Sequence, residues 1–126
     1  MIVLTTSEVK ELHAALIAET GGLGGIRDEA LLESAVLSAV QSFADQDLYP
    51  TAEQKAARLA YGICKNHPFL DGNKRTAILV MLMTLKLNHI TCNYSQQELV
   101  KLGLGIADGS IEYDSVLEWI NTHKHQ

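Results

Sequence analysis

The sequence has few cysteines, no long apolar run and no excess of basic residues, and each shortage excludes a class of protein. The two cysteines, Cys64 and Cys92, lie far apart and form no C-x-x-C pair, which excludes a disulfide framework and favours a reducing compartment. Residues Met1–Thr6 lack the basic start and longer apolar region of a signal peptide. The most apolar run, Thr76–Leu85, is about half the ~20 residues that a membrane span requires. We therefore expect a cytoplasmic protein with no membrane segment.

Acidic residues outnumber basic ones. The chain has 10 lysines and arginines against 15 aspartates and glutamates, a formal net charge of −5 and a pI of about 5.4. Proteins that bind phosphate backbones usually carry a clear basic excess, so no direct nucleic-acid partner is expected. A local basic cluster in this chain is then expected to bind a compact anion.

What is present is typical of one soluble domain spanning residues 1–126. The composition is 47% hydrophobic and 20% charged, which is ordinary for a globular protein. A chain of this length buries roughly two-thirds of its unfolded surface, enough for one core without metal or disulfide support.

Helix-start signals recur along the chain and strand signals are scarce. Asp28 is a good N-cap, and three Ser or Thr residues are followed three positions later by Glu or Gln, the pattern of a capping box. These pairs are Thr5 with Glu8, Thr51 with Gln54, and Ser95 with Glu98. Apolar residues at helical spacing follow each signal. The sequence predicts an all-α bundle of roughly six helices, with Ile2–Leu4 and Ser110–Tyr113 as the only short strand candidates and Ser42–Pro50 as an exposed loop.

One helix boundary is marked by Pro68. The helix that begins after Thr51 is predicted to stop near Asn66, because a proline disfavours helical backbone at the residue before it. The same effect predicts extended backbone at His67. An apolar helix is predicted from about Lys74 to Leu87.

The loop between these two helices carries the residues of chemical interest. Gly72 and Asn73 can form a sharp turn that leads directly into a helix. The first N–H groups of a helix have no internal partner and favour negative charge, yet this first turn carries two cations, Lys74 and Arg75. Cations there are unfavourable by up to ~1 kcal/mol each unless an anion lies among them. The pattern indicates a phosphate pocket.

Two further residues of the loop suit phosphate chemistry. His67 can take a proton from a hydroxyl near neutral pH, and a carboxylate beside phosphates, here Asp71, commonly holds Mg²⁺. Phe69 is an apolar anchor for the loop. Each residue alone has an ordinary structural explanation, but together they are the parts of phosphoryl or nucleotidyl transfer, where positioning and charge stabilisation supply most of the catalysis.

The run His67–Arg75 resembles the Fic signature H-P-F-x-D-G-N-G-R-x-x-R, and its Asn-Lys-Arg resembles the death-on-curing (Doc) branch of that family. Gly24–Asp28 and Asp47–Pro50 are also similar to stretches of Doc toxins. The resemblance implies a compact Fic-fold bundle. It implies that His67 is the base acting on the target hydroxyl and that Asp71 is the Mg²⁺ ligand. It further implies that the Gly72–Asn73 turn, Lys74 and Arg75 bind the phosphates of ATP.

Two departures from the general Fic signature bear on the reaction. Lys74 replaces the second glycine and Ile78 replaces the second arginine, and both weaken the case for adenylyl transfer, the common Fic reaction. Doc-type toxins transfer the γ-phosphate of ATP to elongation factor Tu, so the resemblance implies a kinase that arrests translation. The chain also departs from the best-known Doc pattern, with Gly72 where Ala can occur and apolar Leu79 one turn further on. Adenylyl transfer to a protein hydroxyl, and a module that acts mainly by binding its antitoxin as a co-repressor, remain alternatives.

The resemblance also implies a Phd-like antitoxin whose C-terminal segment docks as a helix, in a groove whose residues the sequence does not identify. Whether the loop Ser42–Pro50 aligns the target polypeptide as a flap is left open. The glycine-rich run Gly21–Gly25 is interpreted as a plain connection between helices. His13 lacks ligand-like spacing, and Cys64 is interpreted as a core residue.

Overall fold

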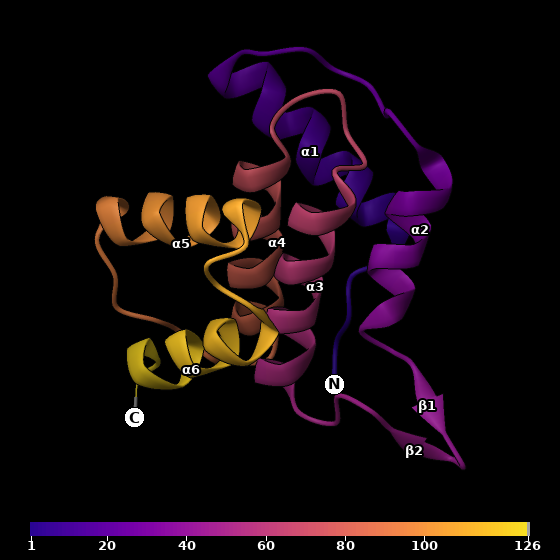
Figure 1. The fold of residues 1–126 in the computed structure, drawn as a ribbon, viewed down its shortest axis with the longest axis vertical. Coiled ribbons are helices and arrows are strands. Elements are labelled where there is room, and N and C mark those ends of the chain that lie inside the picture. Colours follow the sequence, from indigo (N-terminus) through magenta and orange to yellow (C-terminus); the bar gives the residue numbers. More distant parts are fainter. Residues whose placement is uncertain (126) are drawn as a thin grey trace.

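The computed structural model describes residues 1–125 as a bundle of six helices with one very short hairpin (Figure 1). The prediction of an all-α bundle is confirmed. In chain order the elements are α1 (Thr6–Thr20), α2 (Glu29–Ser38), β1 (Ser42–Phe43), β2 (Gln46–Asp47), α3 (Ala52–Asn66), α4 (Asn73–Leu87), α5 (Gln96–Asp108) and α6 (Tyr113–His123).

The helix starts are those that the sequence predicts. All three capping boxes form, each with the side-chain oxygen accepting from the backbone N–H three residues on and the Glu or Gln accepting in return. Asp28 caps α2 through Leu31 N–H. These bonds satisfy amide groups that a helix cannot satisfy itself, which is why such short local patterns locate helix starts reliably.

Helices α3 and α4 lie side by side at the centre of the bundle, with α1 and α2 on one side and α5 and α6 on the other (Figure 1). Their facing residues, such as Leu59, Ile63, Val80 and Met81, are fully buried. The loop that joins α3 to α4 lies at one end of this central pair, where the connection from α1 to α2 also passes.

The strand predictions were wrong. Within residues 1–125 the only paired strands are β1 and β2, at the tip of the loop predicted between Ser42 and Pro50. The backbone of Ile2 pairs with the side chain of Asn88 instead of a strand. Ile111 packs against the backbone of Gly105, so closely that a Cβ on the glycine would lie 2.3 Å from its Cδ1, and α6 begins two residues later.

The hairpin lies at the N-terminal end of α3, whereas His67 follows the C-terminal end (Figure 1). A helix of 15 residues is roughly 22 Å long, so the hairpin is remote from His67 and is not placed to align a polypeptide beside it. Among the described residues, no helix combines the length and the apolar character needed to cross a bilayer.

Candidate active site between α3 and α4

The loop from His67 to Gly72 begins with a left-handed residue. His67 is the C-cap of α3 with φ 51° and ψ 52°, so the prediction of extended backbone was wrong, while the helix end at Asn66 is confirmed. His67 N–H donates to the carbonyl of Ile63 at 3.1 Å and closes the last turn of α3, and the left-handed backbone at His67 then turns the chain away from the helix axis. This cap directs the His67 side chain outward, and the side chain is exposed.

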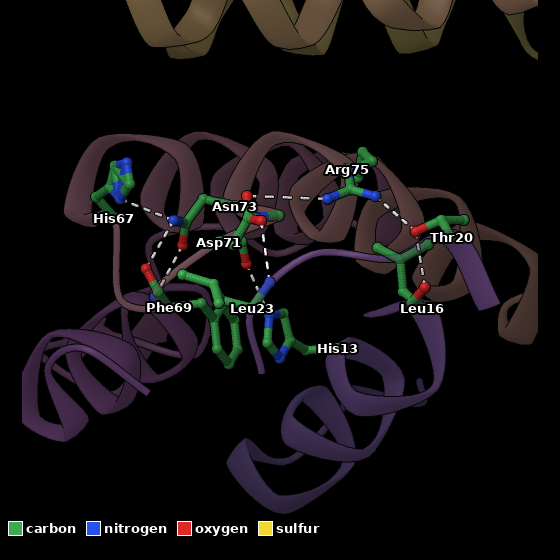
Figure 2. Close-up of polar contacts among 10 residues, drawn as sticks. His13, Leu16, Thr20, Leu23, His67, Phe69, Asp71, Asn73 and Arg75 are labelled. Carbon is green, nitrogen blue, oxygen red and sulfur yellow. Dashed lines mark hydrogen bonds and ion pairs between the residues drawn. The ribbon is translucent and has the colours of Figure 1, made fainter. Parts of the chain in front are cut away.

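Asn73, at the start of α4, closes the loop on itself (Figure 2). Its side chain is buried; Oδ1 accepts from Phe69 N–H at 2.9 Å and Nδ2 donates to the Phe69 carbonyl at 2.9 Å. Nδ2 also lies 2.7 Å from Nδ1 of His67. Because Oδ1 accepts from an N–H group, Nδ2 is the donor to His67, and a neutral His67 ring then carries its hydrogen on Nε2. The amide of Asn73 is thus used within the loop, and Phe69 is a fully buried anchor, as predicted.

The Asp71 carboxylate is held by backbone amides. It accepts from Gly72 N–H at 2.8 Å and from Leu23 N–H at 3.1 Å, and Arg75 Nη2 lies 3.9 Å from Oδ1. The bond from Leu23 N–H, then that from Gly72 N–H, holds the pKa of Asp71 below its usual range. Asp71 is therefore ionised at neutral pH.

The N-terminus of α4 differs from that of every other described helix. Helices α1, α2, α3, α5 and α6 each carry an acidic residue in the first turn, whereas α4 carries none and has Lys74 and Arg75 there. Gly72 caps α4 in the left-handed region, at φ 77° and ψ 21°, and offers no side-chain acceptor. Helix amides without an internal partner, the helix dipole and two cations are the features that favour an anion at a helix N-terminus.

All six residues predicted for the site line one cavity of about 170 Å³. They are His67, Asp71, Gly72, Asn73, Lys74 and Arg75, joined by Cys64, Leu70 and Ala107. Burial raises the pKa of the Cys64 thiol to about 11, so this cysteine is not a nucleophile at neutral pH. Among the described residues no three His, Cys, Asp or Glu side chains gather closely enough to hold a metal. A cation bound through Asp71 would take its other ligands from a nucleotide and water, which is the usual manner of Mg²⁺.

A second, apolar groove of about 350 Å³ shares Lys74 and Arg75 with the site cavity. The rest of its lining comes from α1, α4 and α5 and is mostly aliphatic: Leu16, Thr20, Ile78, Leu79, Leu82, Gln96, Leu99, Val100, Gly103 and Leu104. Ile78 and Leu79 are two of the four positions where the chain departs from the Fic or Doc pattern, and both line this groove. These two departures therefore give the groove apolar lining next to the candidate site.

The glycine-rich connection between α1 and α2, interpreted from the sequence as a plain connection, contacts the loop from His67 to Gly72. Ile26 forms an antiparallel bridge with Phe69, and Leu70 N–H donates to the Gly25 carbonyl at 3.2 Å. A Cβ on Gly22 would lie 2.5 Å from Asp71 Oδ2, so the glycine allows a close approach to the carboxylate. The connection therefore supports the loop, although none of its residues lines the cavity. Its glycines and the similarity of Gly24–Asp28 to Doc toxins were the available signals in the sequence.

His13 of α1 and Arg27 of the connection also contact the loop, which the sequence did not predict. His13 is buried, its ring stacks on that of Phe69 with centroids 3.8 Å apart, and its Nε2 lies 2.8 Å from the Asp71 carbonyl oxygen (Figure 2). Arg27 donates through Nε to the His67 carbonyl at 2.7 Å and through Nη2 to the Asn66 carbonyl at 2.9 Å. No local sequence pattern predicts either contact, because 39 or more residues separate the partners.

Comparison with known proteins agrees with this geometry. The sequence profile described as Fic/DOC family matches residues 3–85. Protein kinase doc of Escherichia phage P1 is 30% identical over 115 residues, covering 91% of this chain and 90% of that protein. Toxin Doc of Mycolicibacterium smegmatis is 37% identical over 70 residues, covering 56% of this chain and 54% of that protein. The chain belongs to the Fic/DOC family, and its relatives place it on the Doc branch.

Proposed function

We propose that this protein is a toxin that transfers the γ-phosphate of ATP to a hydroxyl of a protein, with elongation factor Tu as the target. The observation that carries the proposal is the single cavity at the N-terminus of α4, which brings together two cations, an ionised carboxylate and an imidazole. The names of the two relatives, a protein kinase and a toxin, support the same activity.

The phosphates of ATP are bound by the first amides of α4 together with Lys74 and Arg75. Arg75 is anchored by its bond to the Thr20 hydroxyl at 2.5 Å, which holds the guanidinium on the α1 side of the cavity (Figure 2). Asp71 binds Mg²⁺, whose charge would offset that of the phosphates. The lowered pKa of Asp71 keeps the carboxylate ready for a cation at neutral pH.

His67 accepts the proton of the target hydroxyl. In the described state its Nδ1 accepts from Asn73, so a neutral ring has hydrogen on Nε2. Acceptance at Nε2 requires that this hydrogen first move to Nδ1, which breaks the contact with Asn73. Binding of substrate has to supply that rearrangement, and the exposed position of the ring allows it.

Phosphoryl transfer is favoured over adenylyl transfer by where the positive charge lies. Both cations of the site stand in the first turn of α4, and the next turn presents Ile78, which is 8% exposed, in place of a second phosphate-binding arginine. Positive charge is therefore concentrated around one end of the triphosphate.

The test is transfer of label from ATP to purified elongation factor Tu and to a bacterial lysate. Label on the γ-phosphate is expected to transfer and label on the α-phosphate is not. His67→Ala and Asp71→Ala are expected to abolish transfer, whereas His89→Ala, which removes an exposed histidine after α4, is expected to leave it unchanged. Transfer of α-label alone, rising in Lys74→Gly, would establish adenylyl transfer instead.

The apolar groove is the place we propose for a Phd-like antitoxin. An amphipathic helix would lay its aliphatic stripe along α4 and α5, with an acidic residue reaching Lys74 and Arg75 at the end of the groove. Leu104→Glu, in the groove, is expected to abolish antitoxin binding, whereas Leu37→Glu on α2, of nearly equal exposure at 53% against 51%, should not. Equal loss of antitoxin binding in Leu104→Glu and Leu37→Glu would show that the antitoxin does not bind in this groove.

A purely binding role as a co-repressor is the second candidate, and the same groove supports it. It predicts that growth arrest on expression survives Asp71→Ala. A catalytic toxin predicts that this variant no longer arrests growth while it still binds the antitoxin.

A further inference from the structure

We infer that His13 and Arg27, which lie outside the catalytic loop, are positioning residues that hold its two ends separately. His13 fixes the end that binds metal and phosphate, and Arg27 fixes the end that carries the base. The inference rests on the proposed function for what each end does, and on contacts of the described residues for how each end is held.

His13 holds the turn that leads into α4. Its side chain is 3% exposed, and its ring lies face to face with Phe69, at an interplanar angle of 7°. A carbonyl oxygen only accepts, so Nε2 of His13 donates the hydrogen bond of 2.8 Å to the Asp71 carbonyl. That carbonyl belongs to the peptide joining Asp71 to Gly72. The bond therefore fixes the plane from which both the Asp71 carboxylate and the left-handed turn at Gly72 project.

Arg27 holds the end of α3. Its Nε and Nη2 donate to the carbonyls of His67 and Asn66, and its backbone N–H donates to the Pro68 carbonyl at 2.7 Å. The last carbonyls of a helix lack internal partners, and a guanidinium fork suits two adjacent acceptors. Left-handed backbone is unfavourable for a residue other than glycine, so these bonds stabilise the conformation from which the His67 ring projects.

The two contacts share no partner. His13 contacts Phe69 and Asp71, whereas Arg27 contacts Asn66, His67 and Pro68. Loss of the first contact should weaken binding of Mg·ATP, and loss of the second should slow transfer from a complex that still forms. Residues that only support the fold would lower both in parallel.

The role of His13 is tested with two variants. His13→Phe keeps a stacked ring and removes the hydrogen-bond donor, whereas His13→Gln restores a donor on a side chain of similar length. Calorimetry with Mg·ATP is expected to give a Kd on the order of tenfold weaker for His13→Phe, the size of effect seen when a partner of a metal ligand is lost. His13→Gln should recover most of the affinity. Lys10→Gln, which removes the surface ion pair between α1 and Glu29 of α2, is the matched control and should bind as the wild type does.

The role of Arg27 is tested with two variants. Arg27→Met keeps the aliphatic part of the side chain, whereas Arg27→Lys keeps the charge but not the paired donors of the guanidinium. Arg27→Met is expected to lower kcat on the order of 10- to 100-fold, since small misplacement of a catalytic group has effects of that size. The Kd for Mg·ATP should stay within about twofold, and Arg27→Lys should lie between Arg27→Met and the wild type.

The inference would be overturned if His13→Phe and Arg27→Met lost affinity for Mg·ATP and kcat equally. It would also be overturned if His13→Gln failed to recover binding. If the wild type transfers no phosphate, the proposed function fails while the positioning roles remain open to NMR. The backbone amides of Asp71 and Gly72 should then shift in His13→Phe and stay in place in Arg27→Met. The His67 ring signal should show the opposite pattern, and the same shifts in both variants would refute separate positioning.

Discussion

The two ends of α3 are built differently, although a cation supports each. At the N-terminal end, Lys55 is 5% exposed and its ammonium contacts the Asp47 carboxylate and the carbonyls of Ala39 and Tyr49. Its partners are at most 16 residues away in sequence. At the C-terminal end, Arg27 reaches across 40 residues to the His67 carbonyl.

The two ends of α3 differ in how far along the sequence the residues that stabilise them lie. The hairpin end is stabilised by contacts within a short stretch, so it is a local structure. The site end depends on His13 and Leu23, which lie 58 and 48 residues before Asp71. A substitution in α1 can therefore disturb the site, whereas one in the hairpin should not.

The largest effect is expected from Asn73→Ala. The change leaves Phe69 N–H and the Phe69 carbonyl without the side chain that joins them across the loop. We expect phosphate transfer to fall by on the order of 100-fold, because the catalytic loop loses its defined conformation. The measurement is the initial rate with γ-labelled ATP.

Asn88→Ala is a matched control at the other end of α4. Asn88 makes the same kind of clamp, accepting from Ile2 N–H and donating to the carbonyls of Ile2 and Thr84, each at 2.8 Å. It should lose stability on the order of 1 kcal/mol per hydrogen bond and keep its activity. Equal loss of activity in Asn73→Ala and Asn88→Ala would show that the clamp beside the candidate site is no more important for activity than the clamp at the other end of α4.

The sequence predicted the helices well and the site only in part. The capping boxes are complete local signals, and the identity of six site residues follows from one contiguous run. Extended backbone was predicted at His67 from Pro68 alone, whereas the residue is a left-handed cap whose carbonyl accepts from Arg27, 40 residues earlier in the chain. The support from Gly22–Asp28 was missed because its bonds to the loop join residues 39 to 48 apart in sequence.

Lys55→Met should produce the next largest effect, at the hairpin end. The variant removes the donor to the Ala39 and Tyr49 carbonyls and leaves them buried without it. We expect the free energy of unfolding to fall by about 1–3 kcal/mol and proteolysis between residues 42 and 48 to increase. The Kd for Mg·ATP should not change; a weaker Kd in the folded variant would show that the two ends communicate.

A smaller effect on stability is expected when the pH is lowered and Glu53, in the first turn of α3, becomes protonated. The hydrogen bond from Lys124 holds the pKa of Glu53 below its usual range. A carboxyl whose pKa is lowered by folding stabilises the protein above its unfolded pKa, and the contribution is lost as the pH falls through its folded pKa. Glu53→Gln should thus be less stable than the wild type at pH 7, by under about 1 kcal/mol.

The stabilities of Glu53→Gln and the wild type should converge as the pH falls towards 3, because the stabilising contribution is lost as the Glu53 carboxylate becomes protonated. Urea denaturation at both pH values makes the measurement. Glu33→Gln, on the exposed face of α2, is the control and should match the wild type throughout. A difference that persists at pH 3 would assign the effect to packing.

The smallest effect is expected in the reactivity of the Cys64 thiol, which should respond to changes at the C-terminal end of α3 and not to changes at its N-terminal end. Cys64 lines the cavity and, with a pKa raised to about 11 by burial, should react slowly with iodoacetamide at pH 8. Asn73→Ala should increase its alkylation several-fold, whereas Lys55→Met should not. Cys92, whose pKa burial also raises, is the internal reference in the same mass spectrum.

The bridge between Ile26 and Phe69 has a consequence for the order of folding. Pairing of α3 with α4 does not by itself complete the loop between them, since its contacts with the connection from α1 to α2 form only after some 40 residues of chain have been closed. A partly folded chain would then contain most of its helices and still lack the supported loop. The proposed activity should therefore be lost in the same transition as the global fold during denaturation.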